Sequence, residues 1–428
     1  MKIAMFTNTY LPHVGGVARS VSTSADILRQ LGHDVCIVAP EFDGAEMSSD
    51  DVLRVPAIQN FNGSDFSLRL PQPWLISEFI EKFRPDVIHS HHPFLLGDAA
   101  VRVAYERRLP LIFTHHTMYE QYTHYVPGDS DSLKRVAVQM ATEYCNLCHQ
   151  VIAPSQSVAD LITDRGVSVP ICSLPTGIDT HFFANGEASR FRRKHQISDK
   201  ACVLGHVGRL AEEKNLIFLT TAVSEALQHR PETIFLVVGD GDSRPQMDRI
   251  LSSHVDSSRI VFTGRLSGQD LADAYSAMDA FVFASRSETQ GMVLAEAMAA
   301  GCPVVALDAP GVREIVTDAN GRLLSSDATE SDFAIAIMQL TENTKQLMQM
   351  SEEALLTAQS FGQDVVAKDL IKVYEQSLDN VRAADGGDLT GWDMLQGRLQ
   401  AEWFLLEEKA SALMASIIET EATQAELV

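Results

Sequence analysis

The sequence has no apolar run long enough to span a bilayer, and it is poor in basic residues. Lys and Arg number 34 against 57 Asp and Glu, which gives a net charge of −23. Such a chain lacks the charge attraction on which nucleic-acid binding depends, so we expect no nucleic-acid partner. Its first residues lack the charged region and apolar stretch of a signal peptide. We therefore expect a cytoplasmic protein with reduced cysteines.

Motifs of common cofactor and metal enzymes are also missing. No G-x-G-x-x-G follows the first strand-like run, and no H-E-x-x-H occurs. Gly239-Asp-Gly-Asp242 contains D-x-D by its letters only, because its position indicates a loop. Cys145-Asn-Leu-Cys148-His149 fits a c-type haem attachment pattern, but such attachment needs export, for which no signal is expected. A zinc site would need a second C-x-x-C, which is missing, so we expect buried thiols. We predict no cofactor and no essential metal.

The chain does contain a regular alternation of apolar β-rich runs and helical segments, which predicts βαβ units and parallel sheets in an α/β fold. The expected strands are Ile3–Thr7, Val35–Ala39, Val87–His89, Leu111–Thr114, Val151–Ala153, Val203–Gly208, Ile234–Val238, Ile260–Phe262, Phe281–Ala284 and Val304–Leu307. A polar, weakly patterned stretch before residue 201 separates the two series of strands. We expect a first domain at 1–183, a second at 199–362, a final helix at 363–382 and an acidic helical tail at 383–428.

The tail carries apolar residues at spacings of three and four, which predicts an amphipathic helix. They are Trp392, Leu395, Leu399, Trp403 and Leu406. Three explanations fit this stripe: packing on the same chain, a homodimer contact, or a lipid-facing surface.

The most informative segment holds two glutamates eight residues apart, Glu288 and Glu296. An apolar run precedes them, and Gly301 with a second apolar run follows, so the segment predicts strand, loop, helix and strand. Ligands of open α/β sheets bind outside the carboxyl ends of the strands, and a helix amino end offers N–H groups to a phosphate. One carboxylate can bond sugar hydroxyls and the other ribose hydroxyls, with a diphosphate between them. This arrangement suits a nucleotide-sugar site.

Two cations and two glycines add to this site. Arg209 follows the strand that opens the second domain, and Lys214 precedes the next helix. A guanidinium and an ammonium at a strand end suit a diphosphate leaving group. Gly15 and Gly16 follow the first strand, where a glycine pair lets backbone approach a phosphate. Taken alone, the two glycines could simply form a turn, and the two cations could be solvated charges of a loop.

Histidines gather after two strands of the first domain. The residues are His89, His91, His92, His115, His116 and His124. A metal site, structural hydrogen bonds to backbone, and contacts to a sugar or catalysis all remain open for them.

The Glu288–Glu296 segment resembles the E-(x)7-E motif of the retaining glycosyltransferases of family 4, and the resemblance extends over most of residues 1–376. It implies the GT-B fold, with two Rossmann-like domains facing across a cleft. The segments 113–117, 89–91 and 175–179 resemble the family's anomeric-carbon, acceptor-side and cleft segments. The resemblance implies catalytic roles for His116, Arg209, Lys214 and Glu288. It implies donor binding by Gly15, Gly16, Arg209, Lys214, Glu288, Gln290, Gly291, Met292, Val293 and Glu296, and acceptor-side roles for His89, His91 and Tyr119.

Residues 287–294, 115–125 and 89–94 look most like the branch that glucosylates diacylglycerol. The resemblance implies transfer of a hexose, glucose first, from a UDP-linked donor to diacylglycerol or a related glycolipid with retention of configuration. Residues 66–83 would form an apolar lip for peripheral contact with the inner face of the membrane. The alternative is the same chemistry on a soluble sugar, polyol or sugar phosphate. A GT-B epimerase or phosphorylase and a non-catalytic sugar-binding protein are more distant alternatives.

Overall fold

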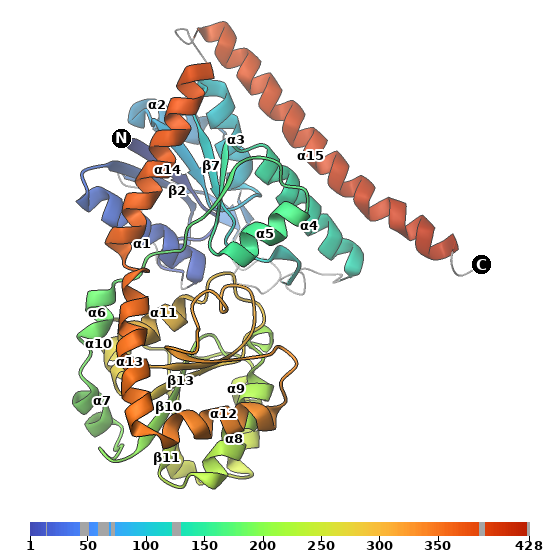
Figure 1. Cartoon of the computed structure of the whole chain (residues 1–428). Helices are drawn as coiled ribbons and strands as arrows, with labels where there is room; N and C mark the ends of the chain where they lie inside the picture. Colours follow the sequence, from blue (N-terminus) through green and yellow to red (C-terminus); the bar gives the residue numbers. More distant parts are fainter. Residues whose placement is uncertain are drawn as a thin grey trace. The chain divides into compact units, whose positions relative to one another are not determined.

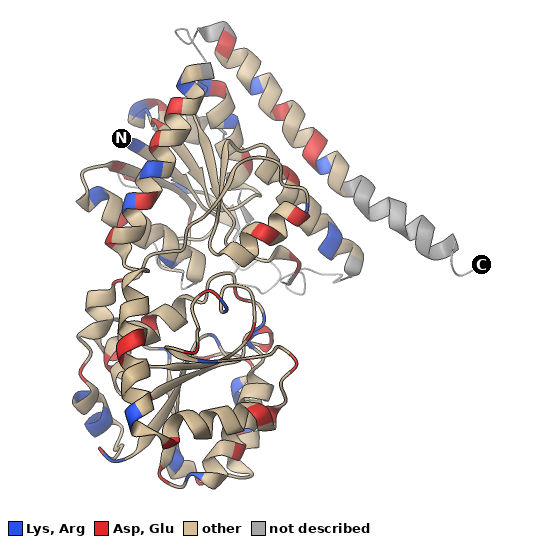
Figure 2. Cartoon of the chain, in the orientation of Figure 1, with Lys and Arg blue, Asp and Glu red and all other residues tan. Residues whose placement is uncertain are grey.

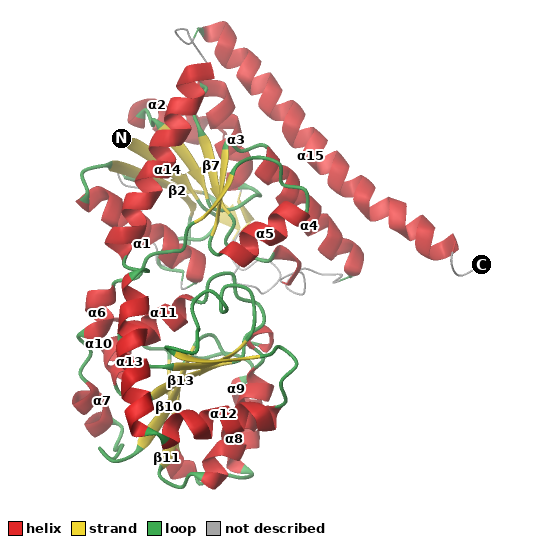
Figure 3. Cartoon of the chain, in the orientation of Figure 1, coloured by secondary structure: helices red, strands yellow, loops and turns green. Residues whose placement is uncertain are grey.

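The computed structural model describes residues 1–13, 15–42, 51–58, 68–69, 73–121, 130–384 and 390–425. The chain packs as two compact units, and Figure 1 shows their elements coloured along the sequence. The first unit comprises Met1–Pro175 and Val366–Val428, and the second comprises Thr176–Val365. Each unit has a sheet in its interior and helices around it (Figure 3).

The first unit contains a sheet of seven parallel strands in the order β3-β2-β1-β6-β7-β8-β9. Ile3 of the central strand pairs with Val35 on one side and Val87 on the other. Both faces are covered, which explains why these strands are almost uninterrupted apolar runs. The strands are β1 (Lys2–Phe6), β2 (Asp34–Pro40), β3 (Val52–Val55), β6 (Val87–Ser90), β7 (Leu111–Thr114), β8 (Gln150–Ala153) and β9 (Ile171–Ser173), beside a small hairpin of β4 (Ala57–Ile58) and β5 (Leu68–Arg69).

Helices α1 and α14 bury their apolar residues on one face of this sheet, and α2 to α5 bury theirs on the other. The helices are α1 (Gly16–Gln30), α2 (Pro73–Phe83), α3 (Leu96–Arg107), η2 (Tyr119–Gln121), α4 (Asp131–Asn146), α5 (Gln156–Asp164), α14 (Gln363–Ala384) and α15 (Gly391–Ala425). Helix α14 belongs to the second unit at its first residues and to the first unit from Val366 onward.

Helix α15 is the predicted tail helix, and one of its faces packs on α3 and α4 of its own chain. Ala401, Leu405 and Ala412 are buried there. Charges of both signs lie along the helix (Figure 2), and Glu402 and Lys409 form ion pairs with α3. The apolar residues at the other side of the helix are exposed, namely Leu395, Leu399, Trp403 and Leu406. Packing on the same chain therefore accounts for one face of the tail, and these four residues of the predicted stripe stay exposed. The side chain of Trp392 lies outside the described residues.

The second unit contains a sheet of six parallel strands in the order β12-β11-β10-β13-β14-β15. Its strands are β10 (Cys202–Val207), β11 (Thr233–Val238), β12 (Ile260–Gly264), β13 (Ala280–Phe283), β14 (Val304–Leu307) and β15 (Gly321–Leu324). Its helices are α6 (Thr180–Ala184), α7 (Ala188–Lys194), η4 (Glu212–Lys214), α8 (Leu216–His229), α9 (Arg244–Ser252), η5 (Ser257–Arg259), α10 (Gly268–Ser276), α11 (Met292–Ala299), α12 (Glu330–Glu342) and α13 (Thr344–Gln359).

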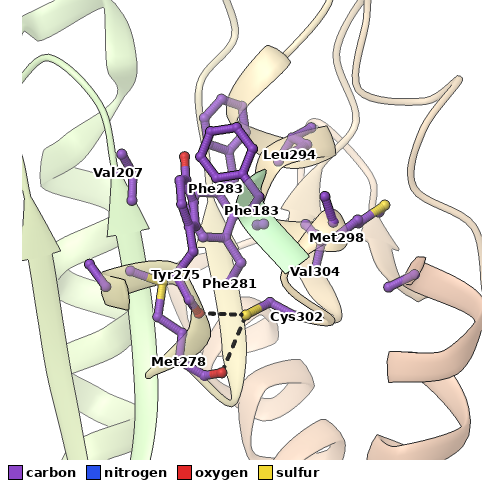
Figure 4. Close-up of a cluster of buried hydrophobic side chains, with 14 of the residues drawn as sticks. Phe183, Val207, Tyr275, Met278, Phe281, Phe283, Leu294, Met298, Cys302 and Val304 are labelled. Carbon is purple, nitrogen blue, oxygen red and sulfur yellow. Dashed lines mark hydrogen bonds between the residues drawn. The ribbon is translucent and has the colours of Figure 1, made fainter. Parts of the chain in front are cut away.

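One core of this unit is rich in aromatic rings (Figure 4). Phe183 contacts Tyr275 edge to face at 5.5 Å between ring centroids, and Phe281 and Phe283 stack beside them. Because Phe183 and Phe191 are buried in this core, residues 176–197 pack with the second unit. The sequence-based division had placed residues up to 183 in the first domain.

Candidate active site

The strand order of the second unit reverses between β10 and β13, which lie side by side at the centre of its sheet. In open α/β sheets such a switch point forms a crevice at the carboxyl ends of the two strands, where ligands bind. Arg209 and Lys214 lie in the segment after β10, and Glu288 lies in the loop after β13. The fold therefore brings these three predicted residues to one edge of the sheet.

Glu288 and Lys214 form an ion pair across this edge. The Nζ–Oε1 distance is 2.5 Å, and the side chains of Lys214 and Glu288 are 18% and 15% exposed. Burial raises the pKa of Glu288, but the ammonium of Lys214 and hydrogen bonds from Lys214 and Ser285 outweigh it, so the pKa lies below its ordinary value. Glu288 is an ionised hydrogen-bond acceptor at neutral pH.

Arg209 is held by a residue that the sequence did not single out. Its guanidinium forms an ion pair with Glu213, whose side chain is 8% exposed, while that of Arg209 is 44% exposed. The segment then turns at Asn215, which adopts a left-handed conformation with φ of 53°. The Asn215 side-chain amide donates to the carbonyl of Ala284, at 3.1 Å. The segment that carries both cations is thus fixed to the end of β13.

His206, on β10, is a second residue that the motif did not reveal. The ring is 1% exposed, and Nδ1 lies 3.2 Å from the carbonyl oxygen of Val282. Burial lowers the pKa of His206 to about 4, so the ring is neutral. Because only a protonated Nδ1 can donate to that carbonyl, Nε2 is an acceptor. It has no hydrogen-bond partner among the described residues.

The Gly-Asp-Gly segment after β11 packs its backbone against the Arg209 segment. A Cβ atom at Gly239 would lie 1.8 Å from the carbonyl oxygen of Gly208, and one at Gly241 would lie 2.4 Å from that of Leu210. The amide of Leu210 donates to the carbonyl of Asp240, at 3.0 Å. These glycines are needed for close backbone packing, and the segment supports the Arg209 turn.

Helix α11 begins where the sequence predicts. Gly291 precedes it in the left-handed conformation with φ of 70°, and Met292 and Val293 form its half-buried first turn. Glu296 is fully buried in the second turn and accepts a hydrogen bond from the hydroxyl of Tyr275, at 2.7 Å. Tyr275 belongs to the aromatic core of Figure 4, so the second glutamate of the motif is anchored to that core.

Gln290 lies between the two glutamates, and its side chain forms hydrogen bonds with the backbone of Thr176. The amide of Thr176 donates to Oε1 at 2.6 Å, and Nε2 donates to the carbonyl of Thr176 at 2.8 Å. The residue is 5% exposed. Its side-chain amide is therefore engaged within the protein, and a donor contact by that amide stays a prediction.

The first unit has its own switch point, between β1 and β6. The amide of Asn8, after β1, donates to Nδ1 of His92, after β6, at 3.1 Å. Gly15 and Gly16 lie at the amino end of α1. Gly15 is extended, with φ of −167°, and a Cβ at Gly16 would meet nothing within 4 Å. A Cβ at Gly15 would lie 3.1 Å from Nε2 of His13, so the two positions differ in the space around them, and a phosphate contact by either glycine stays a prediction.

Three of the predicted histidines lie side by side, with ring centroids 4.1 Å apart for His89 and His91 and 5.2 Å apart for His91 and His116. His91 Nδ1 shares a hydrogen bond with His116 Nε2, at 2.9 Å. His89 bonds the hydroxyls of Tyr374 and Thr114 through its two nitrogens, each at 2.7 Å. Burial lowers the pKa of His89 to about 3, and burial with neighbouring rings lowers the pKa values of His91 and His116 well below the ordinary value. All three rings are neutral.

Three buried polar atoms of this region have no hydrogen-bond partner among the described residues. They are His91 Nε2, His115 Nδ1 and the hydroxyl oxygen of Tyr119. Leaving such atoms unmet costs about 1–3 kcal/mol each, so a water or a polar ligand group is expected beside them. His89 differs, because both of its nitrogens are engaged. His124 and, within the lip at 66–83, residues 66–67 and 70–72 lie outside the described residues, whereas Trp74 on α2 is 67% exposed.

The remaining sequence features concern metals, thiols and membranes. Cys145 and Cys148 are free and buried, which confirms the expected thiols. In the described part of the chain, no group of three His, Cys, Asp or Glu side chains is placed to hold a metal ion. No described helix combines the length and the apolar content needed to cross a bilayer.

Comparison with known proteins identifies relatives over both units. Sequence profiles described as Glycosyltransferase Family 4 and Glycosyl transferases group 1 match residues 14–182 and 201–343. Alpha-monoglucosyldiacylglycerol synthase of Streptococcus pneumoniae is 29% identical over 374 residues, 85% of this chain and 84% of the relative. GDP-mannose-dependent alpha-mannosyltransferase of Mycolicibacterium smegmatis is 30% identical over 398 residues, 90% of this chain and 100% of the relative.

A solved structure shows the same fold. Sucrose-phosphate synthase from Thermosynechococcus elongatus matches with a TM-score of 0.74 at 18% identity, covering 89% of this chain and 99% of that chain. The predicted GT-B fold with two Rossmann-like domains is thereby confirmed. Together, the two profiles and a relative 30% identical over 90% of the chain show that this protein belongs to glycosyltransferase family 4.

Proposed function

We propose that the protein transfers glucose from a nucleotide diphosphate donor, UDP-glucose, to a hydroxyl of diacylglycerol or a related glycolipid, with retention of configuration. The observation that carries the proposal is the Lys214–Glu288 ion pair beside Arg209 at the switch point of the second unit. The lipid acceptor and the glucose rest on the relative named alpha-monoglucosyldiacylglycerol synthase.

On the donor side, Arg209 and Lys214 stabilise the negative charge that grows on the departing diphosphate. Both cations have carboxylate partners in the structure, so they are held in place before a donor binds. Glu288 accepts hydrogen bonds from the sugar hydroxyls, and Glu296 from the ribose. The amide groups of Met292 and Val293, in the first turn of α11, donate to the phosphates. The two cations take the place of a metal ion, and no essential metal is proposed.

The chemistry proceeds on one face of the sugar. The bond from C1 to the leaving phosphate oxygen breaks, the acceptor oxygen forms its bond to C1 on the same side, and the acceptor proton passes to the leaving diphosphate. No separate protein base is needed, and the lowered pKa values of His91 and His116 make these rings weak bases. The two relatives are named for alpha-linked products, which agrees with retention from an alpha-linked donor. His116, supported by His91, positions the sugar.

On the acceptor side, His91 Nε2 and the Tyr119 hydroxyl are suited to bind the acceptor, because both are polar, buried and without a described partner. A phosphate contact by Gly15 and Gly16 stays what the family resemblance implies. The protein would work at the inner face of the membrane through peripheral contact. A second candidate is the same transfer from GDP-mannose, which the mannosyltransferase relative favours, to a lipid or a soluble acceptor.

Glu288→Gln tests the proposal directly. This change removes the charge of the sugar-binding carboxylate and keeps its shape, so nucleotide binding should persist while transfer to diacylglycerol falls by about a hundredfold or more. Glu352→Gln, at an exposed position of α13, is the matched control for loss of one negative charge. Equal transfer rates in Glu288→Gln and in the control would refute the role given to Glu288.

A further inference from the structure

The loop between the two glutamates is held from both sides by backbone. On one side, Gly311 leaves no room for a side chain, because a Cβ atom there would lie 2.5 Å from the amide nitrogen of Gln290. On the other side, Thr176 forms two hydrogen bonds with the Gln290 side chain, at 2.6 and 2.8 Å. A primary amide can accept from one backbone N–H and donate to the carbonyl of the same residue, as a neighbouring strand would.

Thr176 is itself firmly placed. The next residues pair with the segment before α14, since the amide of Ile178 donates to the carbonyl of Phe361 and the amide of Gln363 donates to that of Ile178, at 2.8 and 2.9 Å. Gly177 has no space for a side chain, because a Cβ there would lie 2.6 Å from Cα of Gln363. Gln290 thus ties the loop after β13 to a segment that is paired on its other edge.

The Gln290–Thr176 contact lies within the segment whose residues are proposed to bind the donor. Glu288 lies two residues before Gln290, and the first turn of α11 begins two residues after it. Gly291, in the left-handed conformation, separates Gln290 from that turn. A loop fixed at Gln290 therefore sets both where the Glu288 carboxylate lies and where the first amides of α11 point.

We propose that Gln290 is a positioning residue: its side-chain amide clamps the backbone of Thr176 and so pre-orders the loop that binds the donor. This inference rests on the donor site proposed above, and it gives the Gln290 side chain a role through the loop in place of the direct donor contact that the family resemblance implies. If the Gln290 side chain had only a structural role, its hydrogen bonds to Thr176 would leave donor binding unchanged.

Three variants of the full chain test the clamp. Gln290→Ala removes both hydrogen bonds. Gln290→Glu keeps the acceptor for the Thr176 amide, and a carboxyl regains the donor only when it is protonated. Gln228→Glu, exposed on α8 of the same unit, controls for the added carboxyl. The measurements are hydrogen exchange of the peptides that contain Thr176 and residues 286–291, and KM and kcat for UDP-glucose from pH 5 to 8.

In Gln290→Ala, we expect faster exchange in both peptides and a donor KM raised about tenfold to a hundredfold, with a smaller change in kcat, because two ordinary hydrogen bonds are worth about that factor. In Gln290→Glu, the donor KM should recover toward the wild-type value as the pH falls to 5, and the control should show no such recovery. A donor KM within about twofold of wild type in Gln290→Ala would overturn the proposal, as would a pH-independent defect in Gln290→Glu.

Hydrogen exchange also separates the two possible failures. If the wild-type protein transfers no sugar, the proposed function fails, but slow exchange at Thr176 that is lost in Gln290→Ala still demonstrates the clamp. If transfer is normal and exchange at Thr176 is the same in wild type and Gln290→Ala, the clamp fails while the proposed function stands.

Discussion

Replacing Lys214 tests the electrostatics of the donor site most sharply. Lys214 holds Glu288 at 2.5 Å, and both side chains are less than one fifth exposed. Methionine at 214 keeps much of the length of the side chain and removes the charge. It leaves a half-buried carboxylate without its main cation, so the effect of burial then decides the pKa of Glu288, which rises.

The size of the expected loss in kcat/KM follows from the interactions that Lys214→Met removes. A hydrogen bond to a charged group contributes about 1.5–3 kcal/mol, and the same cation is expected to stabilise the departing diphosphate. We expect kcat/KM for the donor to fall about tenfold to a hundredfold at neutral pH, since each factor of ten corresponds to roughly 1.4 kcal/mol.

The pH dependence gives the decisive readout. In the wild type, the depressed pKa of Glu288 keeps the carboxylate ionised, and its contribution is lost only as the pH falls through that low value. In Lys214→Met the acid limb of kcat/KM against pH should move to higher pH, and in Lys214→Arg it should move little. In Glu288→Gln, further replacement of Lys214 should have a smaller effect than in wild type, because the pair is already broken. An unmoved acid limb together with additive effects would refute the coupling of the two residues.

Three further predictions test other parts of the account. Arg209→Ala should lower donor kcat/KM by about a hundredfold while Arg209→Lys loses less, and unchanged kinetics would remove Arg209 from the diphosphate role. Burial and Asp98 raise the pKa of Glu408 to about 8, so the folded state holds a proton there and stability falls as the pH rises toward 8. Thermal unfolding of Glu408→Gln should therefore show a higher Tm than wild type at pH 8 and a smaller difference at pH 5. The corresponding difference in the free energy of unfolding is on the order of a few kcal/mol at most. An equal Tm of the two proteins at pH 8 would contradict this. Transfer should persist in excess EDTA, and a loss that Mg²⁺ or Mn²⁺ restores would show that a metal is essential.

The sequence predicted most of the sheet strands, because buried parallel strands are apolar runs that stand out from their surroundings. Ten expected strands are present. The missed strands of the two parallel sheets are β3, β9 and β15, and each lies at an edge of its sheet; the short hairpin of β4 and β5 was missed as well. The sequences of these three edge strands carry Arg54, Ser173 and Arg322 in short segments. An edge strand pairs on one side only, so it needs fewer apolar residues and gives a weaker pattern.

The sequence also assigned Lys214 and Glu288 to one site, and the structure pairs these two residues. Glu288 and Lys214 are 74 residues apart, and their meeting follows from the adjacency of β10 and β13. Motif spacing could not reveal the partners within the site, such as Glu213 for Arg209 or Thr176 for Gln290. These contacts depend on side-chain directions and on strand order, which periodicity does not specify.

The histidine group illustrates the same limit in the first unit. The sequence placed His89, His91 and His116 at or after the ends of two strands, but it did not distinguish their roles. The structure pairs His91 with His116 and gives His89 two hydroxyl partners, one of them Tyr374 from 285 residues away. The sequence signal for Tyr374 was only that of a helical apolar position, so its hydrogen bond could not be foreseen.

The measurement that tests the central claim most directly is a product analysis by mass spectrometry. Purified protein would be incubated with UDP-glucose or GDP-mannose and diacylglycerol vesicles in one reaction, and with the same donors and a pool of soluble metabolites in another, with Glu288→Gln as the control. The account predicts a glucosyl lipid from UDP-glucose whose amount falls by about a hundredfold or more with Glu288→Gln. Formation of a glycosylated product only in the soluble pool, or only from GDP-mannose, would contradict it.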